Sequence, residues 1–388
     1  MLAVLWFAAA ACTGSGGEER VVRVDFKHDE FASHYWRYFP ASVYAHPGDT
    51  VVFRQEWTGE PHTVSFGSAL DDVSKELREL EESFPEEPTP EQEAAGFQRY
   101  QELTEGVVLD PYLDASAPSA AKPCYLETGD PSRYRDASCP QQQQPSFDGK
   151  HSFYSSGFIA PLGPEGNVFR VPLDDEIEPG TYSFYCAIHF QSMRGSLIVA
   201  EPGEEVPSAR EQSRTALDEI EALATPLRDA FEDMKAGRAE TDGERVRGPI
   251  AGYHAGDEFT VAIDEFVPDK ISARVDEPIS WTVVGAHTIS FDVPRFVPVY
   301  QVSDDGTVER NPVVDKAAGG SPEPPPPDFQ SGPIDIDGGT WDGDGFFSSG
   351  LLAGEPSAKY TVRVSKAGEY RFACLVHPEM VGTLEVVG

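Results

Sequence analysis

One strand pattern occurs twice in this chain and decides its fold: GTYSFYC at residues 180–186 and GEYRFAC at residues 368–374. Each copy begins with Gly, carries aromatic side chains two positions apart, as in a half-buried β-strand, and ends with Cys. Far upstream of each copy, a second pattern is also repeated, as HTVSF at residues 62–66 and HTISF at residues 287–291. The chain therefore contains one structural unit twice.

Each unit offers one thiolate, two imidazoles and one thioether at similar spacings. The candidate ligands are, in order along the chain, His62, Cys186, His189 and Met193, and then His287, Cys374, His377 and Met380. Because the chain has only 5 Cys, 9 His and 4 Met, chance is a poor explanation for two such sets. The set suits a trigonal His₂Cys copper site with a weak axial Met, the arrangement of blue electron-transfer copper.

Length and composition favour a mainly β protein with more than one domain. A chain of 388 residues predicts two or three domains, and 35 Gly, 33 Pro and many alternating runs favour β-sandwiches with long loops. The net charge of -36 excludes nucleic acid as a partner, because phosphates would be repelled. The acidic surface could steer a basic redox partner such as a cytochrome, or it could serve only solubility or a salty medium.

The repeat sets the expected domain boundaries. We expect a first domain at residues 21–201, interrupted by an acidic insertion at 68–150, and a second at 251–388 with an insertion at 292–340. Between them, residues 202–250 form a connector with a helix of its own. Ser208 and Glu211 have the spacing of a capping box at its start. Helical spacing from Leu70 to Leu80 predicts a helix in the first insertion as well.

The N-terminus and the remaining cysteines indicate export. Residues 1–12 are an apolar run that ends in AAAC, too short to span a bilayer, and resemble a signal peptide with Cys12 as the lipidation candidate. Residues 13–20 would be a flexible tether; an ordinary export signal is the alternative. Cys124 and Cys139 lie in one polar, Pro-rich loop, where a disulfide or a free pair of thiols is expected. We expect a lipoprotein on the extracytoplasmic face of a membrane, or a protein of the periplasm or cell surface.

These motifs resemble the cupredoxins, the family of plastocyanin, amicyanin and pseudoazurin, present twice in tandem. The resemblance covers about residues 21–66 with 151–201, and about 251–291 with 341–388. It implies a Greek-key β-sandwich in each unit. It also implies that the eight residues named above bind two copper ions, with His62 and His287 as the upstream ligands. The second loop spacing is similar to that of amicyanin, and the first has one more residue.

The resemblance also implies roles for neighbours of the ligands. In this family the loop histidine lies at the surface within an apolar ring, where electrons leave. Phe190 and Pro378, directly after the two loop histidines, fit that ring. Thr63 and Thr288, directly after the upstream histidines, are candidates for groups that orient the ligands.

The favoured function is therefore an exported electron carrier with two type 1 copper centres, served by redox proteins such as a cytochrome or an oxidase. One alternative is a copper oxidoreductase with an additional catalytic copper. Such enzymes place His beside the copper Cys and use His-x-His pairs, and the chain has neither. It has room for one further copper on three histidines, with His28, His34 and His151 as candidates. Copper storage or delivery is a third possibility, although exposed Met and His clusters are missing.

Overall fold

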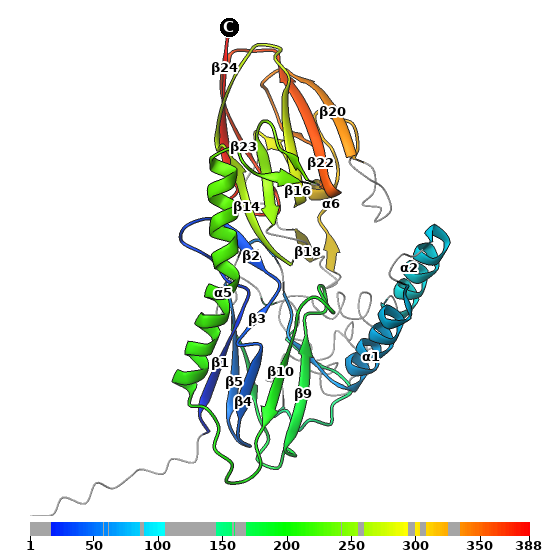
Figure 1. Cartoon of the computed structure of the whole chain (residues 1–388), viewed down its shortest axis with the longest axis vertical. Coiled ribbons are helices and arrows are strands. Elements are labelled where there is room, and N and C mark those ends of the chain that lie inside the picture. Colours follow the sequence, from blue (N-terminus) through cyan, green and yellow to red (C-terminus); the bar gives the residue numbers. More distant parts are fainter. Residues whose placement is uncertain are drawn as a thin grey trace, which may run out of the picture.

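The computed structural model describes residues 17–56, 58–60, 62–85, 89–104, 145–156, 159, 168–241, 243–254, 260–293, 299–302, 308–324 and 334–388. These residues form two β-sandwiches arranged along the long axis of the molecule, with one long helix beside both (Figure 1). The expected mainly β fold is therefore confirmed. Cys12, Cys124 and Cys139 lie outside the described residues, so lipidation and the disulfide stay predictions. Among the described residues, no helix combines the length and the apolar composition needed to cross a membrane.

The first sandwich packs a four-stranded sheet, in the order β3-β1-β5-β8, against a five-stranded sheet, β4-β10-β9-β6-β7. The strands are β1 Glu19–Val24, β3 Tyr38–Phe39, β4 Ser42–Ala45, β5 Thr50–Gln55, β6 Ser65–Phe66, β7 Tyr154–Ser155, β8 Val168–Pro172, β9 Gly180–Tyr185 and β10 Arg194–Val199. Strands β1 and β5 are parallel, as are β4 and β10, so crossovers rather than hairpins join them. The core between the sheets contains Val22, Phe53, Phe66 and Phe184.

The second sandwich packs a six-stranded sheet, β2-β14-β13-β16-β22-β20, against a five-stranded sheet, β15-β24-β23-β17-β21. The strands are β2 Ser33–Tyr35, β13 Ile250–His254, β14 Val261–Val267, β15 Lys270–Arg274, β16 Ile279–His287, β17 Ser290–Phe291, β20 Ile334–Trp341, β21 Phe347–Ser348, β22 Leu352–Val364, β23 Gly368–Ala373 and β24 Val381–Val387. Its core contains Trp281, Phe291 and Phe372. Smaller elements are β11 Glu240–Thr241, β12 Glu244–Arg245, β18 Tyr300–Val302, β19 Val308–Arg310 and α6 Pro312–Asp315.

The sequence repeat corresponds to equivalent places in the two sandwiches. In the first, Ser65 of β6 pairs with Tyr185 at the end of β9 and with Ser155 of β7. In the second, Ser290 of β17 pairs with Ala373 at the end of β23 and with Ser348 of β21. In both, the segment that follows the upstream histidine thus lies beside the strand that ends at the cysteine.

The two sandwiches are joined by more than the connector. Residues 33–35, which the repeat places in the first domain, form β2 and pair with β14 in the sheet of the second. Helix α5, Ala209–Lys235, packs against β1 and β3 of the first sandwich and against β13 and β14 of the second. Figure 1 shows that it runs beside both sandwiches. Tyr35, Ile220 and Ile263 share the resulting apolar cluster. The capping box of Ser208 and Glu211 at the start of α5 is confirmed.

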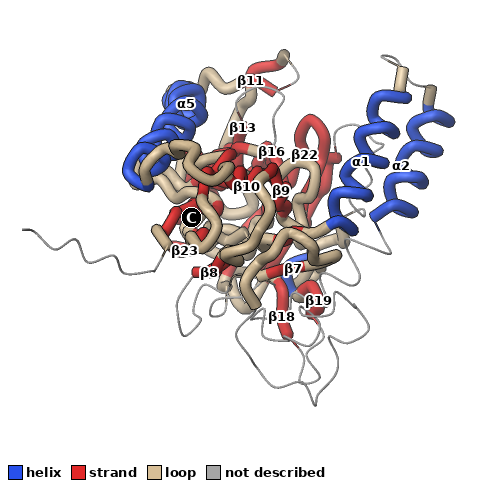
Figure 2. The backbone as a smooth tube through the Cα atoms, turned by 90° about the horizontal axis from the view of Figure 1, so that it is seen from below, coloured by secondary structure: helices blue, strands red, loops and turns tan. Residues whose placement is uncertain are grey.

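The first insertion begins with two helices on the side of the molecule opposite α5 (Figure 2). Helix α1, Ser68–Ser83, confirms the predicted helical spacing, because Leu70, Val73 and Leu77 are buried. Helix α2, Pro90–Thr104, packs beside it. The buried face of α1 covers the end of β9 and the loop after it, which include Tyr185 and Phe190.

Candidate metal centres

The first centre forms where β9 ends beside β6. The Sγ atom of Cys186 lies 3.6 Å from Nδ1 of His189 and 3.9 Å from Nδ1 of His62. Two backbone hydrogen bonds close the loop: the Cys186 N–H donates to the carbonyl of Met193, and the Met193 N–H donates to that of His189. Met193 is fully buried in the same core cluster as Cys186.

The second centre repeats this arrangement at the end of β23. The Sγ atom of Cys374 lies 3.7 Å from Nδ1 of His377 and 3.9 Å from Nδ1 of His287, and the two Nδ1 atoms are 3.1 Å apart. The Cys374 N–H donates to the carbonyl of Met380, and the Met380 N–H donates to that of His377. Met380 is fully buried beside Cys374 in the second core.

Both triangles have the size that one transition-metal ion requires. Bonds of about 2.0–2.3 Å from a metal to nitrogen and sulfur leave the ligand atoms roughly 3.3–3.7 Å apart. The observed separations, 3.1 to 3.9 Å, bracket that range. In the second triangle, two Nδ1 atoms face each other, and one ion bound to both would satisfy their lone pairs. The donor set therefore fits copper or another thiophilic metal.

The electrostatics of both triangles favour the thiolate. Burial opposes ionisation of the two thiols, but the neighbouring imidazoles outweigh it, so the pKa of Cys186 and that of Cys374 lie well below the usual value. Burial would also lower the pKa of His62, whereas hydrogen bonds to Asp25 and Cys186 raise it to about 10. Since the thiolate is the form that binds metals, the chain prepares both sites for an ion.

Thr63 and Thr288 hold equivalent positions around the two sulfur atoms. The hydroxyl of Thr63 accepts the N–H of Ala187 at 2.7 Å, and its own N–H donates to Cys186 Sγ at 3.5 Å. Likewise, the hydroxyl of Thr288 accepts the N–H of Leu375 at 2.9 Å, and its N–H donates to Cys374 Sγ at 3.4 Å. Each threonine thus ties the upstream histidine segment to the cysteine loop and supplies the sulfur with a hydrogen bond.

Asp25, which the sequence motifs do not include, orients an upstream histidine. Its Oδ2 lies 3.0 Å from Nε2 of His62, and both side chains are fully buried. The same carboxylate accepts hydrogen bonds from the N–H of Phe26, the N–H of Tyr35 and the hydroxyl of Thr58. Asp25 adopts a positive φ of 64°, uncommon for a residue other than Gly. A carboxylate at the end of a strand was the available signal, but its partner is distant in the sequence.

The expected surface position of the loop histidines is wrong. Only 8% of the His189 side chain and 2% of the His377 side chain are exposed. Trp36 and Glu60 cover the ring of His189, and Glu60 and His34 of the first unit cover that of His377. Phe190 is buried as well, stacked on Tyr185 under α1, whereas Pro378 is exposed as expected.

Between the two loop histidines lies a cluster of polar groups from both domains. One oxygen of Glu60 lies 3.6 Å from His189 Nε2, and the other accepts a hydrogen bond from His377 Nε2 at 3.3 Å. Burial would raise the pKa of Glu60, but the two imidazoles hold it well below the usual value, so the group is a carboxylate. Asp264 of β14 contacts Nδ1 of His34 at 3.0 Å and Nε2 of His377 at 3.6 Å.

The three spare histidines do not meet. His34 joins the cluster just described, and its Nε2 is buried without a hydrogen-bond partner. His28 stacks on Phe31 instead, and His151 pairs with Asp148. The three candidates for a further copper therefore do not form one site among the described residues, and of the three His34 alone lies near a centre.

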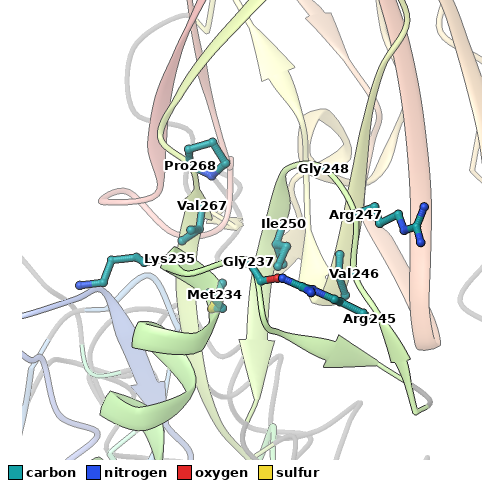
Figure 3. A pocket seen from close by; sticks show the side chains of 10 residues that line it. All are labelled: Met234, Lys235, Gly237, Arg245, Val246, Arg247, Gly248, Ile250, Val267 and Pro268. Atoms are coloured by element: carbon teal, nitrogen blue, oxygen red, sulfur yellow. The ribbon is translucent and has the colours of Figure 1, made fainter.

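A surface pocket of about 520 Å³ lies elsewhere, at the C-terminal end of α5 (Figure 3). Its lining includes Met234, Lys235, Arg245, Arg247 and Pro268. The guanidinium of Arg245 donates to the carbonyl of Gly237, which secures the end of the helix. The pocket shares no residue with either triangle.

No protein-family model and no curated protein matches this chain. Among solved structures, it is similar to an amicyanin mutant in the Cu(I) form, with 12% identity, 50% of this chain and 90% of that chain covered, and a TM-score of 0.20. Auracyanin from Roseiflexus castenholzii is 15% identical to this chain, with 48% of this chain and 99% of that chain covered and a TM-score of 0.24. Plastocyanin from Dryopteris crassirhizoma is 22% identical to this chain, with 32% of this chain and 89% of that chain covered and a TM-score of 0.17.

Proposed function

We propose that this chain is an extracytoplasmic electron-transfer protein with two type 1 copper centres that cycle between Cu(II) and Cu(I). The observation that carries the proposal is the pair of equivalent His₂Cys triangles, each closed by a loop with a buried Met. His62, Cys186, His189 and Met193 would hold one ion, and His287, Cys374, His377 and Met380 the other. Bound copper supplies one-electron redox chemistry.

The surroundings of the ligands support electron transfer rather than substrate chemistry. The ligand side chains are all nearly inaccessible, so they leave no open position for a substrate. Asp25, Thr63 and Thr288 hold the ligands through hydrogen bonds, so their positions change little between oxidation states. Such burial also argues against storage or delivery, which requires that copper be released.

One observation favours the alternative of an oxidoreductase with an additional copper. His34 lies close to Glu60 and His377, and these three residues could hold an ion. The Nε2 atom of His34 is buried without a hydrogen-bond partner. His377, however, faces the second triangle through Nδ1, so the extra site would have one histidine of its own. Electron transfer remains the better supported function.

A copper titration of the purified exported chain, followed by visible absorption, tests the proposal. We expect intense blue colour that rises to a break at two equivalents. Cys186→Ser and Cys374→Ser should each remove one equivalent and keep the other. A chain that stays colourless would overturn the proposal, and a further tightly bound, nearly colourless equivalent would favour the oxidoreductase.

The location and partners are part of the same proposal. Export would place the acidic surface outside the cytoplasm, where a basic redox protein such as a cytochrome could dock. Cys12 would carry the lipid anchor. Cys12→Ala should then release the protein from membranes, and unchanged membrane association would contradict the anchor.

A further inference from the structure

The two triangles face each other across the domain boundary. The loop histidine of each uses Nδ1 toward its own cysteine, which leaves Nε2 pointing away from the sulfur. Both Nε2 atoms meet the carboxylate of Glu60, at 3.6 Å for His189 and 3.3 Å for His377. One side chain therefore spans the gap between a ligand of the first centre and a ligand of the second.

A row of stacked rings runs beside this carboxylate. Trp36 stacks on His189, with ring centroids 4.1 Å apart and planes 14° apart. His34 lies 5.4 Å from Trp36 at 22°, and 5.6 Å from His377 at 11°. Four nearly parallel rings thus connect the same two loop histidines by a second route.

The rest of the fold fixes this geometry. His34 lies in β2, which pairs with β14, and the Trp36 N–H donates to the carbonyl of Thr260 just before β14. Gly59, next to Glu60, has a φ of +118°, and a Cβ there would lie 2.3 Å from the carbonyl oxygen of Val376. The bridging residues of the first domain are therefore held against the loop of the second by backbone contacts rather than by surface side chains.

We propose that Glu60 and the Trp36–His34 pair connect the two centres electronically, so that the chain passes single electrons between its own two copper sites. This inference rests on the proposed function. In each event, one electron leaves a centre that goes from Cu(I) to Cu(II) and enters a centre that goes from Cu(II) to Cu(I). No bond forms or breaks, no proton moves, and no other reactant takes part.

The test uses the full exported chain with both coppers oxidised. A pulse of a small one-electron reductant, such as a photochemically generated flavin semiquinone, delivers less than one electron per chain. The absorption spectra of Cys186→Ser and Cys374→Ser, each with one centre, give the wavelength at which the two centres differ. We expect a redistribution phase whose rate does not depend on protein concentration.

The bridge is tested with Glu60→Ala, Trp36→Leu and the double variant. We expect the concentration-independent rate to fall about tenfold in the double variant, within the range that changes along a contact network produce. Glu265→Gln is the matched control, because Glu265 is also a partly buried carboxylate between the domains but accepts the N–H of Ala32 and, in the part of the chain that the structure describes, contacts no histidine. Its rate should match that of the wild type.

A second measurement does not depend on electron transfer. In the Cu(I) protein, the imidazole Nε2–H signals of His189 and His377 should both shift in Glu60→Ala and stay in place in Glu265→Gln. Suppose that the chain binds two blue coppers but shows no redistribution phase, or that the bridge variants redistribute electrons as fast as the wild type. Either result would overturn the inference but leave the proposed function intact. Failure to bind copper as blue centres would overturn both. If the wild type binds a third metal equivalent that Glu60→Ala does not bind, Glu60 would be a metal ligand rather than a bridge, which would overturn the inference.

Discussion

The Nε2 atom of His62 lies 3.0 Å from a carboxylate oxygen of Asp25, and both side chains are completely buried. The upstream histidine of the second centre has a much weaker counterpart, because Nε2 of His287 lies 4.0 Å from Asp264. The two centres therefore share their residue types but differ in how close a carboxylate lies to the upstream histidine.

Asp25→Asn should weaken metal binding at the first centre. A carboxylate that accepts the second ring N–H fixes the orientation of an imidazole ligand and increases its basicity. We expect copper affinity at this centre to fall about tenfold to a hundredfold, with the second centre unchanged. Its reduction potential should rise, since Cu(II) loses more stabilisation than Cu(I). Competition with a chelator, followed at both centres, measures the affinities.

Asp49→Asn is the control for that substitution. Asp49 is also a buried carboxylate of the first domain, but it pairs with Arg20 and contacts no ligand. A similar loss of copper affinity in both variants would show that Asp25 acts through folding stability alone.

The second centre should have the higher reduction potential. Cys374 Sγ accepts two backbone N–H groups at 3.4 Å, from Thr288 and from Val376. Cys186 Sγ accepts the backbone N–H of Thr63. Ile188 is the residue equivalent to Val376, and no hydrogen bond from its N–H to Cys186 Sγ is found among the described residues. Hydrogen bonds to a ligating sulfur withdraw electron density and stabilise the reduced metal. Redox titration of Cys374→Ser measures the potential of the first centre, and that of Cys186→Ser measures the potential of the second. We expect the second centre to have the higher potential, and the reverse order would contradict this prediction.

The His34–Asp264 pair should make the stability of the metal-free protein depend on pH. Burial would lower the pKa of His34, but Asp264 outweighs it, so the pKa lies above its usual value of 6.5. Glu60 acts in the same direction and His377 opposes it. A raised histidine pKa contributes stability that is complete below pH 6.5 and is lost as the pH rises through the folded-state value.

Thermal unfolding of metal-free wild type and His34→Gln measures this contribution. Asp264, whose pKa is lowered below 3.8, loses its contribution only at acid pH, so the pair is strongest between about pH 4 and pH 6.5. We expect the wild-type advantage over His34→Gln to shrink as the pH rises above that window. Groups distant from His34 titrate alike in both proteins, so parallel curves would mean that the pair is not linked to folding.

The residues of each triangle could be grouped from the sequence because each set depends on local order. The loop from Cys186 to Met193 is a few residues long, and the strand before it has the alternation that places its cysteine beside the upstream histidine. The repeat then made the second set recognisable from the first. The β-sandwich framework followed from the same strands.

The groups between the centres could not be predicted in this way. His34 meets Asp264 across 230 positions of sequence, and Glu60 meets His377 across 317. The first contact depends on the pairing of β2 with β14, which moves a segment of the first unit into the sheet of the second. The second depends on the packing of Gly59 against the loop that contains Val376. The expected exposure of the loop histidines failed for the same reason, since it treated the two sandwiches as independent proteins.

Gly59→Ala should separate the effect of this domain contact from backbone strain. A Cβ at Gly59 would lie 2.3 Å from the Val376 carbonyl oxygen and 2.9 Å from Pro378, at a φ of +118°. Gly203→Ala is the matched control, because Gly203 also has a positive φ, +84°, but no atom within 4 Å of the added Cβ. We expect about 1–2 kcal/mol of destabilisation in the control from strain, and about 1–3 kcal/mol more at Gly59 from the clash. Denaturant unfolding of both variants measures the difference. Equal losses would show that the loop after Cys374 yields freely, and that residues 58–60 do not hold the two centres in place.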